Sequence, residues 1–328
     1  MRIEPGMTVK VYHGYGDEDA LLLYGHVFSK APMPRRRYRK NFFSNTIALI
    51  RMFTPHPAAG IPVWLQWGGQ VIETITDENG FFKLEWKAAQ PLQPGWHVVT
   101  VWAKTPAGEM VTGEGKILIP HHTQYAYVSD IDDTFLVSHS SKMRKRLAVL
   151  FTKNARTRKP FEGVVNHYRL LAQSHVKQDV ENPFFYVSSS EWNLYEYIKE
   201  FCRSYQLPEG VYLLSPLKQW YELLKTGQGK HEGKFMRIAR LLVEFPHRQF
   251  VLLGDDTQKD PEIYAKIVST FPGRIRAVYW RHIRKKSKPE VERLAGEIRA
   301  QGVDVCYFLH SAEAIEHSVR IGLIDMQG

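Results

Sequence analysis

The sequence predicts an α/β fold whose parallel sheet carries helices on both faces, preceded by a smaller all-β sandwich domain. Before about residue 120 the chain consists of short β-type segments separated by turn-forming residues. After about residue 122, apolar strand segments alternate with helical patterns, which is typical of parallel sheets covered by helices. We therefore divide the chain into a β-sandwich-like N-terminal domain, residues 1–121, and an α/β domain, residues 122–328.

The N-terminal domain is expected to contain β strands. Strand-like segments cover residues 7–16, 20–28, 61–67, 71–77, 81–86, 97–105 and 110–119. Residues 71–86 predict a hairpin, because Asn79 and Gly80 lie between two stretches of alternating apolar and polar residues. Short strands at this spacing favour an antiparallel sandwich. We find no catalytic constellation in this half of the sequence.

The C-terminal domain alternates strand and helix. Strand candidates are residues 126–130, 183–189, 211–215, 249–255, 274–280 and 303–309, and helical patterns cover 192–205, 233–246, 260–271 and 288–302. Ligands of parallel α/β sheets bind beyond the carboxyl ends of the strands. Residues that follow these strands are therefore the first candidates for a functional site.

The composition of the chain indicates which kind of partner the protein binds and in which cell compartment it works. In 328 residues, 44 Lys and Arg against 34 Asp and Glu give a net charge of +10, which favours an anionic partner. The two cysteines, Cys202 and Cys306, lie far apart, which argues against a disulfide scaffold or a zinc site. Adjacent histidines such as His121 and His122 on a connector are more often solvated than metal-bound.

The sequence has no apolar signal core and no uncharged apolar run near the roughly 20 residues that span a bilayer. We expect a cytoplasmic protein, with peripheral contact to a membrane left open.

A cluster of acids and a hydroxyl follows the strand at residues 126–130. In the stretch AYVSDIDDTFL these are Asp130, Asp132, Asp133 and Thr134. Asp130 and Asp132 leave the same strand end two residues apart, so they can share a divalent cation or divide the roles of nucleophile and proton donor. A hard cation with oxygen ligands, such as Mg²⁺, would offset their repulsion. The alternative is an acidic turn that caps the next element.

Polar residues also accompany the later strands. Ser188 lies at the end of the second strand, Lys234 lies at the start of the helix after the third, and Asp255 ends the fourth with Asp260 five residues later. Each has an ordinary explanation by itself, since Ser188 could cap a helix and Lys234 could be solvated. Together they form an ordered set at the edge where a parallel sheet binds its ligand.

This ordered set resembles the haloacid dehalogenase superfamily of phosphotransferases, whose sheet is Rossmannoid. The resemblance implies that Asp130 is the nucleophile that forms an aspartyl-phosphate, and that Asp132 is the general acid and base. It implies that Ser188 and Lys234 hold the phosphoryl oxygens. It also implies a magnesium site.

The resemblance implies the following further roles. The magnesium site would comprise Asp130, Asp255 and the backbone carbonyl of Asp132. Asp260 would support this site through water or through Lys234. Thr134 and Ser189 are further candidate contacts to the substrate.

A closer resemblance, to the bacterial members of the actin-patch-associated phosphatidate phosphatase family, covers essentially all of residues 122–328. It rests on residues 153–171, 182–201, 245–281 and 308–324. The activity implied is magnesium-dependent removal of phosphate from phosphatidic acid, which leaves diacylglycerol. The sequence departs from the family pattern at Glu191, where a proline is usual, and in GDDTQ, residues 254–258, where Gly-Asp-Ser-Gly-Gln is more common. Neither departure removes a catalytic group.

A basic stretch follows the predicted nucleophile. No acidic residue occurs from Phe135 to Phe161, whereas Lys and Arg are frequent and are interrupted by apolar residues. Such a segment suits the surface of an anionic bilayer and a lipid headgroup, or it forms a solvated helix that only concentrates phosphate. Arg158 is the candidate contact to the substrate phosphate or headgroup. Further basic runs occur at residues 34–43 and 281–289.

Three alternatives to a phospholipid phosphatase stay open at this point. The substrate is a soluble phosphomonoester, or the end of a nucleic acid, or the chain is a non-catalytic adaptor that binds membranes. No nucleic-acid-binding motif accompanies the basic runs, so nucleic acid is not the expected partner. The set Asp130, Asp132, Ser188, Lys234 and Asp255 argues against an adaptor.

Overall fold

The structure is a computed structural model that describes residues 6–30, 56–121, 125–131, 162–176, 180–215, 230–256, 259–283 and 288–325. Contacts among these residues divide the chain into two compact units. The first unit ends at Pro120 and the second begins at His121. No helix in the described ranges is both long and apolar enough to span a membrane.

The first unit is built from β strands in its described part. The strands are β1 (Thr8–Val11), β2 (Gly14–Gly16), β3 (Leu21–Phe28), β4 (Pro62–Trp67), β5 (Gln70–Ile75), β6 (Phe81–Trp86), β7 (Gly95–Lys104) and β8 (Met110–Ile119). They form one sheet of eight strands in the order β1-β3-β2-β8-β7-β4-β5, with β6 paired to β3. The named pairs are antiparallel except for β2 with β8, which are parallel. That parallel pair differs from the antiparallel pairing that the sequence predicted.

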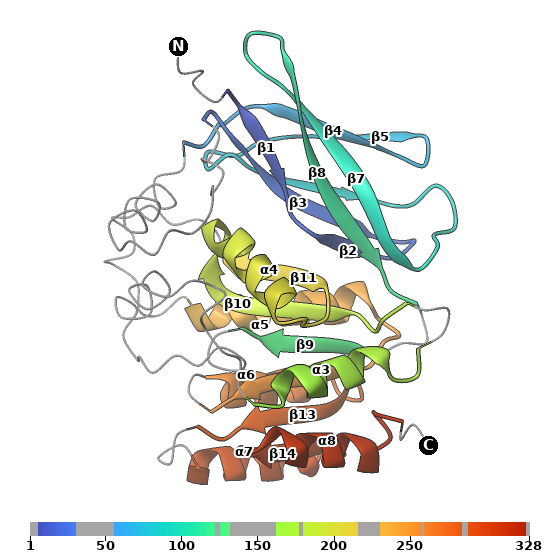
Figure 1. The fold of residues 1–328 in the computed structure, drawn as a ribbon, viewed down its shortest axis with the longest axis vertical. Helices are drawn as coiled ribbons and strands as arrows, with labels where there is room; N and C mark the ends of the chain where they lie inside the picture. Colours follow the sequence, from blue (N-terminus) through green and yellow to red (C-terminus); the bar gives the residue numbers. More distant parts are fainter. Residues whose placement is uncertain are drawn as a thin grey trace. The chain divides into compact units, whose positions relative to one another are not determined.

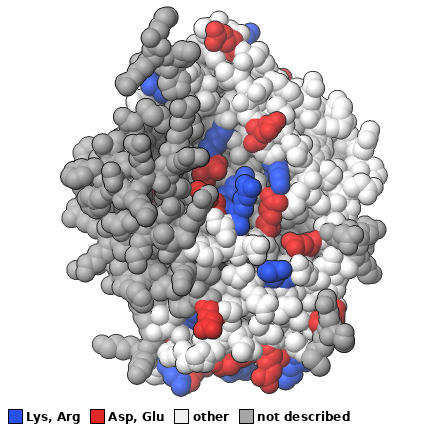
Figure 2. Space-filling model, viewed as in Figure 1, with Lys and Arg blue, Asp and Glu red and all other residues white. Residues whose placement is uncertain are grey.

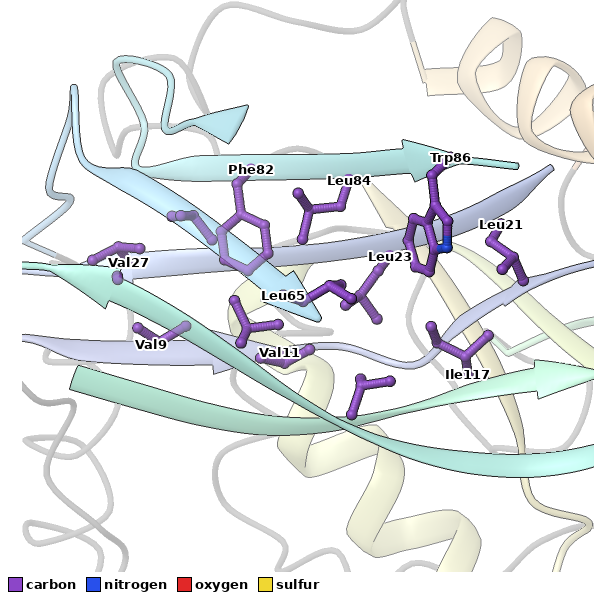
Figure 3. Close-up of a cluster of buried hydrophobic side chains, with 14 of the residues drawn as sticks. Val9, Val11, Leu21, Leu23, Val27, Leu65, Phe82, Leu84, Trp86 and Ile117 are labelled. Atoms are coloured by element: carbon purple, nitrogen blue, oxygen red, sulfur yellow. The ribbon is translucent and has the colours of Figure 1, made fainter. Parts of the chain in front are cut away.

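Alternate side chains of these strands meet in a shared apolar core (Figure 3). In β6, Phe82, Leu84 and Trp86 are buried, whereas the residues between them are more exposed. Leu23 of β3 and Leu65 of β4 belong to the same cluster and are fully buried. Burying one such side chain contributes about 1.5–3 kcal/mol to folding. The alternation seen in the sequence therefore sets which face of each strand enters the core.

The hairpin predicted over residues 71–86 is wrong beyond its turn. Asp77 builds the turn, because its Oδ1 accepts the backbone N–H groups of Asn79 at 2.8 Å and Phe81 at 2.9 Å. The flanking strands then take different partners, β5 with β4 and β6 with β3. A local turn signal determines where the chain reverses, but the partner of each strand depends on which pairing buries its apolar face.

The second unit contains a parallel six-stranded sheet. Its strands are β9 (Ala126–Asp130), β10 (Phe184–Glu191), β11 (Gly210–Ser215), β12 (Phe250–Asp255), β13 (Ile275–Arg281) and β14 (Asp304–Phe308). Its helices are α3 (Val164–Gln173), α4 (Tyr195–Ser204) after the short 3₁₀ helix η1 (Trp192–Leu194), α5 (Lys230–Glu244), α6 (Asp260–Thr270), α7 (Lys288–Arg299) and α8 (Ser311–Arg320). All neighbouring strands are parallel, which confirms the predicted α/β class.

Helices lie on both sides of this sheet (Figure 1). Successive residues of a strand point to opposite faces, and the last two residues of β9 meet different helices. Ser129 Oγ lies 2.8 Å from the hydroxyl oxygen of Tyr168 in α3, whereas Asp130 pairs with Lys234 in α5. Every residue of β9 and β12 is buried, as expected for strands that are covered on both faces.

The strand order places a ligand-binding edge beside β9. The order is β11-β10-β9-β12-β13-β14, so the chain first adds strands on one side of β9 and then continues on the other side with β12. In parallel sheets, ligands bind at the carboxyl ends of the strands where the order reverses. Here that point lies between the end of β9 at Asp130 and the end of β12 at Asp255.

A buried histidine joins α3 to α8. His167 Nε2 lies 2.9 Å from Ser318 Oγ, and the hydroxyl oxygen of Tyr279 in β13 lies 2.7 Å from the same Ser318 atom. Burial, and after it the electrostatic interactions with Arg281 and His317, lowers the pKa of His167 to about 3. His167 is therefore neutral in the folded protein at physiological pH.

We expect His167 to make the second unit sensitive to acid. An unfolded histidine binds a proton near pH 6.5, but folded His167 resists protonation until about pH 3. Its contribution to the free energy of unfolding is complete above pH 6.5 and is lost as the pH falls toward 3, at about 1.4 kcal/mol per pH unit. Urea unfolding between pH 7 and pH 5 measures this slope. A His167→Gln protein should show a slope shallower by that amount, and equal slopes would contradict the expectation.

Candidate functional site

Lys234 lies between two buried carboxylates. Its Nζ is 2.7 Å from Asp130 Oδ1 and also forms a short ion pair with Asp260 Oδ1. The exposed fractions are 3% for Lys234, 1% for Asp130 and 0% for Asp260. Burial by itself would lower the pKa of Lys234, but the charges and hydrogen bonds of the two aspartates raise it above its ordinary value. Lys234 is therefore a cation, and the three groups form one ionic cluster that joins β9, α5 and α6.

The sequence around Asp260 accounts for its close approach to the sheet. Asp260 is the first residue of α6 and is followed by Pro261, a residue that favours the first turn of a helix. A Cβ atom at Gly254 would lie 2.8 Å from Asp260 Oδ2 and 3.0 Å from Tyr264 Cε2, so a larger residue would push both side chains away. The Tyr264 hydroxyl donates to the carbonyl of Leu253 at 2.9 Å, which holds α6 against β12.

Asp255 lies at the same edge of the sheet as Asp130. Leu253 of β12 pairs with Ser129 of β9, so Asp130 and Asp255 follow paired residues in neighbouring strands. Asp255 is fully buried. Burial, followed by the charges of Asp260, Asp130 and, more weakly, Asp255, raises the pKa of Tyr264 well above its ordinary value. The negative charges at the ends of β9 and β12 and at the start of α6 therefore all raise the pKa of the same hydroxyl group, that of Tyr264.

Asp130 and Asp255 suit a magnesium site. Both offer the carboxylate oxygens that Mg²⁺ prefers, at the point where the strand order reverses. Over the described ranges, no three His, Cys, Asp or Glu side chains are arranged to hold a metal ion by themselves. Magnesium commonly uses one or two carboxylates and takes its other ligands from water and substrate phosphate, so this donor set fits it. Asp260 reaches the site through its ion pair with Lys234.

Ser188 lies where β10 departs from regular pairing. The ladder between β10 and β11 runs through Val187 and returns at Glu191, with an irregularity between them. Ser188 is fully buried, and its Oγ accepts the N–H of Ser190 at 2.9 Å. Because Val187 pairs with Asp130 of β9, Ser188 lies one residue beyond the level of Asp130. The fold therefore brings Ser188 to the strand next to the predicted nucleophile.

A polar cluster at the same edge was not predicted from the sequence. Asp256 accepts hydrogen bonds from His282 Nδ1 at 2.8 Å, the Tyr307 hydroxyl at 2.7 Å and the N–H of Ile283 at 2.8 Å. These contacts join the carboxyl ends of β12, β13 and β14. Local sequence contains no signal for this cluster, because its members lie at the ends of three strands that are separate in the sequence.

Two arginines near the site were also missed. Arg237 follows Lys234 by three residues in α5 and donates through Nη2 to the carbonyl oxygen of Ser188 at 3.0 Å. Its spacing from Lys234 could have identified it, because residues three apart share a helix face. Arg281 is buried at the end of β13 and pairs in register with Asp255. Its place beside Asp255 depends on the register between β12 and β13, which the sequence does not reveal.

Other predicted residues lie outside the described ranges or at the margin of the site. Asp132, Thr134 and Arg158 fall outside those ranges, as do the basic run at 34–43 and all of residues 135–161. Ser189 is half-buried next to Ser188. On the face drawn in Figure 2, the described surface shows basic and acidic side chains interspersed rather than one continuous basic patch.

Comparison with known proteins identifies the segment that carries the ionic cluster. Residues 125–282 match the family model described as Phosphatidate phosphatase APP1, catalytic domain. This segment belongs to that family. The matched segment includes Asp130, Ser188, Lys234, Asp255 and Asp260.

Two curated proteins are similar to the chain over about half of its length. Over 157 residues it is 29% identical to Phosphatidate phosphatase APP1 of Saccharomyces cerevisiae, which covers 47% of this chain and 25% of the yeast protein. Over 161 residues it is 24% identical to an uncharacterized protein of Schizosaccharomyces pombe, which covers 48% of this chain and 25% of that protein. The matched part of the chain thus spans about a quarter of the length of each of these two relatives.

One solved structure has low sequence identity and low structural similarity to this chain. A bacterial immunoglobulin-like domain from the M. primoryensis ice-binding adhesin is 15% identical to it, with a TM-score of 0.21. The match covers 36% of this chain and 100% of that domain. A likeness of this degree carries no argument about the fold or the function of this chain.

Replacing Lys234 should destabilise the second unit strongly. In the Lys234→Met protein, two buried carboxylates lose their cation. Removing one partner of a buried ion pair lowers the free energy of unfolding by about 3–5 kcal/mol. Adding Asp260→Asn should restore part of this loss, because it removes one of the stranded charges. Urea unfolding measures both effects. Lys288→Met, at an exposed position of α7, is the control and should change stability by less than about 0.5 kcal/mol. Additive losses in the double variant would show that the two side chains act independently.

Proposed function

We propose that the chain is a magnesium-dependent phosphatase that removes phosphate from phosphatidic acid through an aspartyl-phosphate at Asp130. The match of residues 125–282 to the phosphatidate phosphatase family supports a phospholipid substrate. The observation that carries the chemistry is the ionic cluster of Asp130, Lys234 and Asp260 at the point where the strand order reverses. The same cluster, with Ser188 on the neighbouring strand, supports assignment to the haloacid dehalogenase superfamily.

Lys234 prepares Asp130 to act as a nucleophile. A carboxylate buried without a cation favours its protonated form, which is a poor nucleophile. Lys234 Nζ, 2.7 Å from Asp130, opposes that protonation, and Asp260 holds the ammonium group from another direction. A carboxylate that approaches a phosphate is also repelled by its charge, so the same ammonium group makes the approach less unfavourable.

The proposed reaction has two steps. In the first, a carboxylate oxygen of Asp130 bonds to phosphorus, the bond from phosphorus to the substrate oxygen breaks, and Asp132 donates a proton to that oxygen. In the second, Asp132 accepts a proton from a water molecule that attacks phosphorus, which releases phosphate and restores the Asp130 carboxylate. Division into two steps replaces one difficult displacement by two easier ones. The role of Asp132 rests on its spacing from Asp130 and on the family resemblance.

Asp255 and Arg281 prepare the cation site. Magnesium bound by Asp130, Asp255 and the carbonyl of Asp132 would neutralise charge on the phosphoryl group during transfer. Burial lowers the pKa of Arg281, and the negative charge of Asp255 is among the groups that oppose this shift. Arg281 therefore remains a cation that favours the ionised form of Asp255, the form that binds a metal ion.

Phosphate release should require both Asp130 and magnesium. With phosphatidic acid in detergent micelles, we expect activity that EDTA abolishes and added Mg²⁺ restores. Asp130→Asn and Asp132→Asn should lower the rate by more than about 10³-fold, because each removes a reacting group. Asp304→Asn, at the amino end of β14 and away from the site, is the matched control and should keep the parental rate. Parental activity in Asp130→Asn, with the fold checked by circular dichroism, would reject the mechanism.

The lipid part of the proposal can be tested separately. We expect kcat/KM for phosphatidic acid in mixed micelles to exceed that for glycerol 3-phosphate and for a 5′-phosphorylated oligonucleotide by about tenfold or more. The reason is that apolar contacts to the acyl chains would favour the lipid over the two soluble substrates. The rate should also rise with the surface fraction of the lipid. A preference for a soluble ester without such a rise would reject the lipid substrate and leave the phosphatase chemistry standing.

A further inference from the structure

Arg237 connects the helix that carries Lys234 to the strand that carries Ser188. It lies three residues after Lys234 in α5, and its Nη2 donates to the Ser188 carbonyl oxygen at 3.0 Å. Lys234 reaches Asp130 from the same helix. One helix therefore contacts both the predicted nucleophile and the main chain of the predicted phosphate-binding serine.

The acceptor of this hydrogen bond lies in the irregular part of β10. Regular pairing with β11 extends to Val187 and is recovered only at Glu191. Irregularities of this kind often occur beside active sites, where they change the direction of a side chain. The backbone at Ser188 is therefore held less completely by the strand ladder, and Arg237 supplies a contact from outside the sheet.

The charge of Arg237 is poorly compensated in its surroundings. No acidic side chain of the described residues forms an ion pair with it, and its buried Nε has no hydrogen-bond partner among them. Burial lowers the pKa of Arg237 to about 10, so the guanidinium is still a cation at neutral pH. Arg237 is half-buried, and a cation partly withdrawn from water without a counterion is unfavourable for stability. A role in packing alone would be served better by an apolar side chain of similar length.

We propose that Arg237 is a positioning residue for phosphate binding, which holds the Ser188 main chain so that the Ser188 hydroxyl lies level with Lys234 at the phosphoryl site. This inference rests on the proposed function, and it concerns the same site. Arg237 acts through Ser188 and contributes positive charge near an anion. Neither Asp130 nor the general acid depends on it directly.

The test compares substitutions at Arg237 with a matched change on the same helix. Arg237→Met should raise KM for p-nitrophenyl phosphate and the inhibition constant of inorganic phosphate by about tenfold, with a smaller change in kcat, because a charged hydrogen bond is lost. Arg237→Lys should recover most of the effect, since its ammonium group can also donate to the carbonyl. Arg240→Met removes an arginine that pairs with Glu244 in α5 and should leave both constants unchanged. If Arg237→Met does not fold, Arg237→Gln replaces it.

A double-mutant cycle shows whether Arg237 acts through Ser188. In a Ser188→Ala protein the hydroxyl to be positioned is absent, so Arg237→Met should raise the phosphate inhibition constant by less than about threefold. An equal increase in both backgrounds would overturn the positioning role and would make Arg237 a direct phosphate contact. Unchanged constants in Arg237→Met, or no recovery in Arg237→Lys, would also overturn it.

Failure of the inference can be distinguished from failure of the proposed function. If the parental protein hydrolyses phosphomonoesters and Arg237→Met matches it, only the role of Arg237 is rejected. If the parental protein hydrolyses none of them, the proposed function is rejected. In that case calorimetric titration with inorganic phosphate still tests Arg237, and parental affinity in the Arg237→Met protein rejects its role.

Discussion

The candidate site depends on the buried ammonium group of Lys234. Asp130 comes from β9 and Asp260 from α6, and both carboxylates are withdrawn from water. Without a cation between them, their repulsion would act through a medium of low effective dielectric, and protonation of at least one would follow. The charge of Lys234 allows the Asp130 carboxylate to be buried and ionised at the same time. That combination is the state that an attacking carboxylate needs.

The order of the strands makes this contact possible. β9 has β10 on one side and β12 on the other, so its last residue lies between elements that are far apart in the sequence. Helices in a parallel α/β sheet begin at the carboxyl edge of the strands, and Lys234 and Asp260 both lie in the first part of their helices. The position of the candidate site is thus a consequence of topology, and the chemistry comes from the residues placed there.

Two polar groups at this edge illustrate how structural and functional roles differ. Among the described residues, Asp256 accepts hydrogen bonds from His282 and Ile283, which follow β13, and from Tyr307 in β14, and these account for its burial. Within the described ranges, Arg237 donates a hydrogen bond to the Ser188 carbonyl at 3.0 Å, and no described carboxylate balances its charge. The first arrangement satisfies its buried charge internally and holds three strand ends together. The second leaves positive charge beside a site that is proposed to bind an anion.

The sequence by itself determined the α/β class of the second half and the strand ends that carry Asp130, Ser188 and Asp255, because strand period and the residues that end a strand are local properties. It also identified Lys234, through the order of motifs along the chain. Only the tertiary structure decided that β5 and β6 take different partners and that Arg237 reaches Ser188. These contacts join residues distant in sequence, and their selection depends on how all strands and helices pack at once.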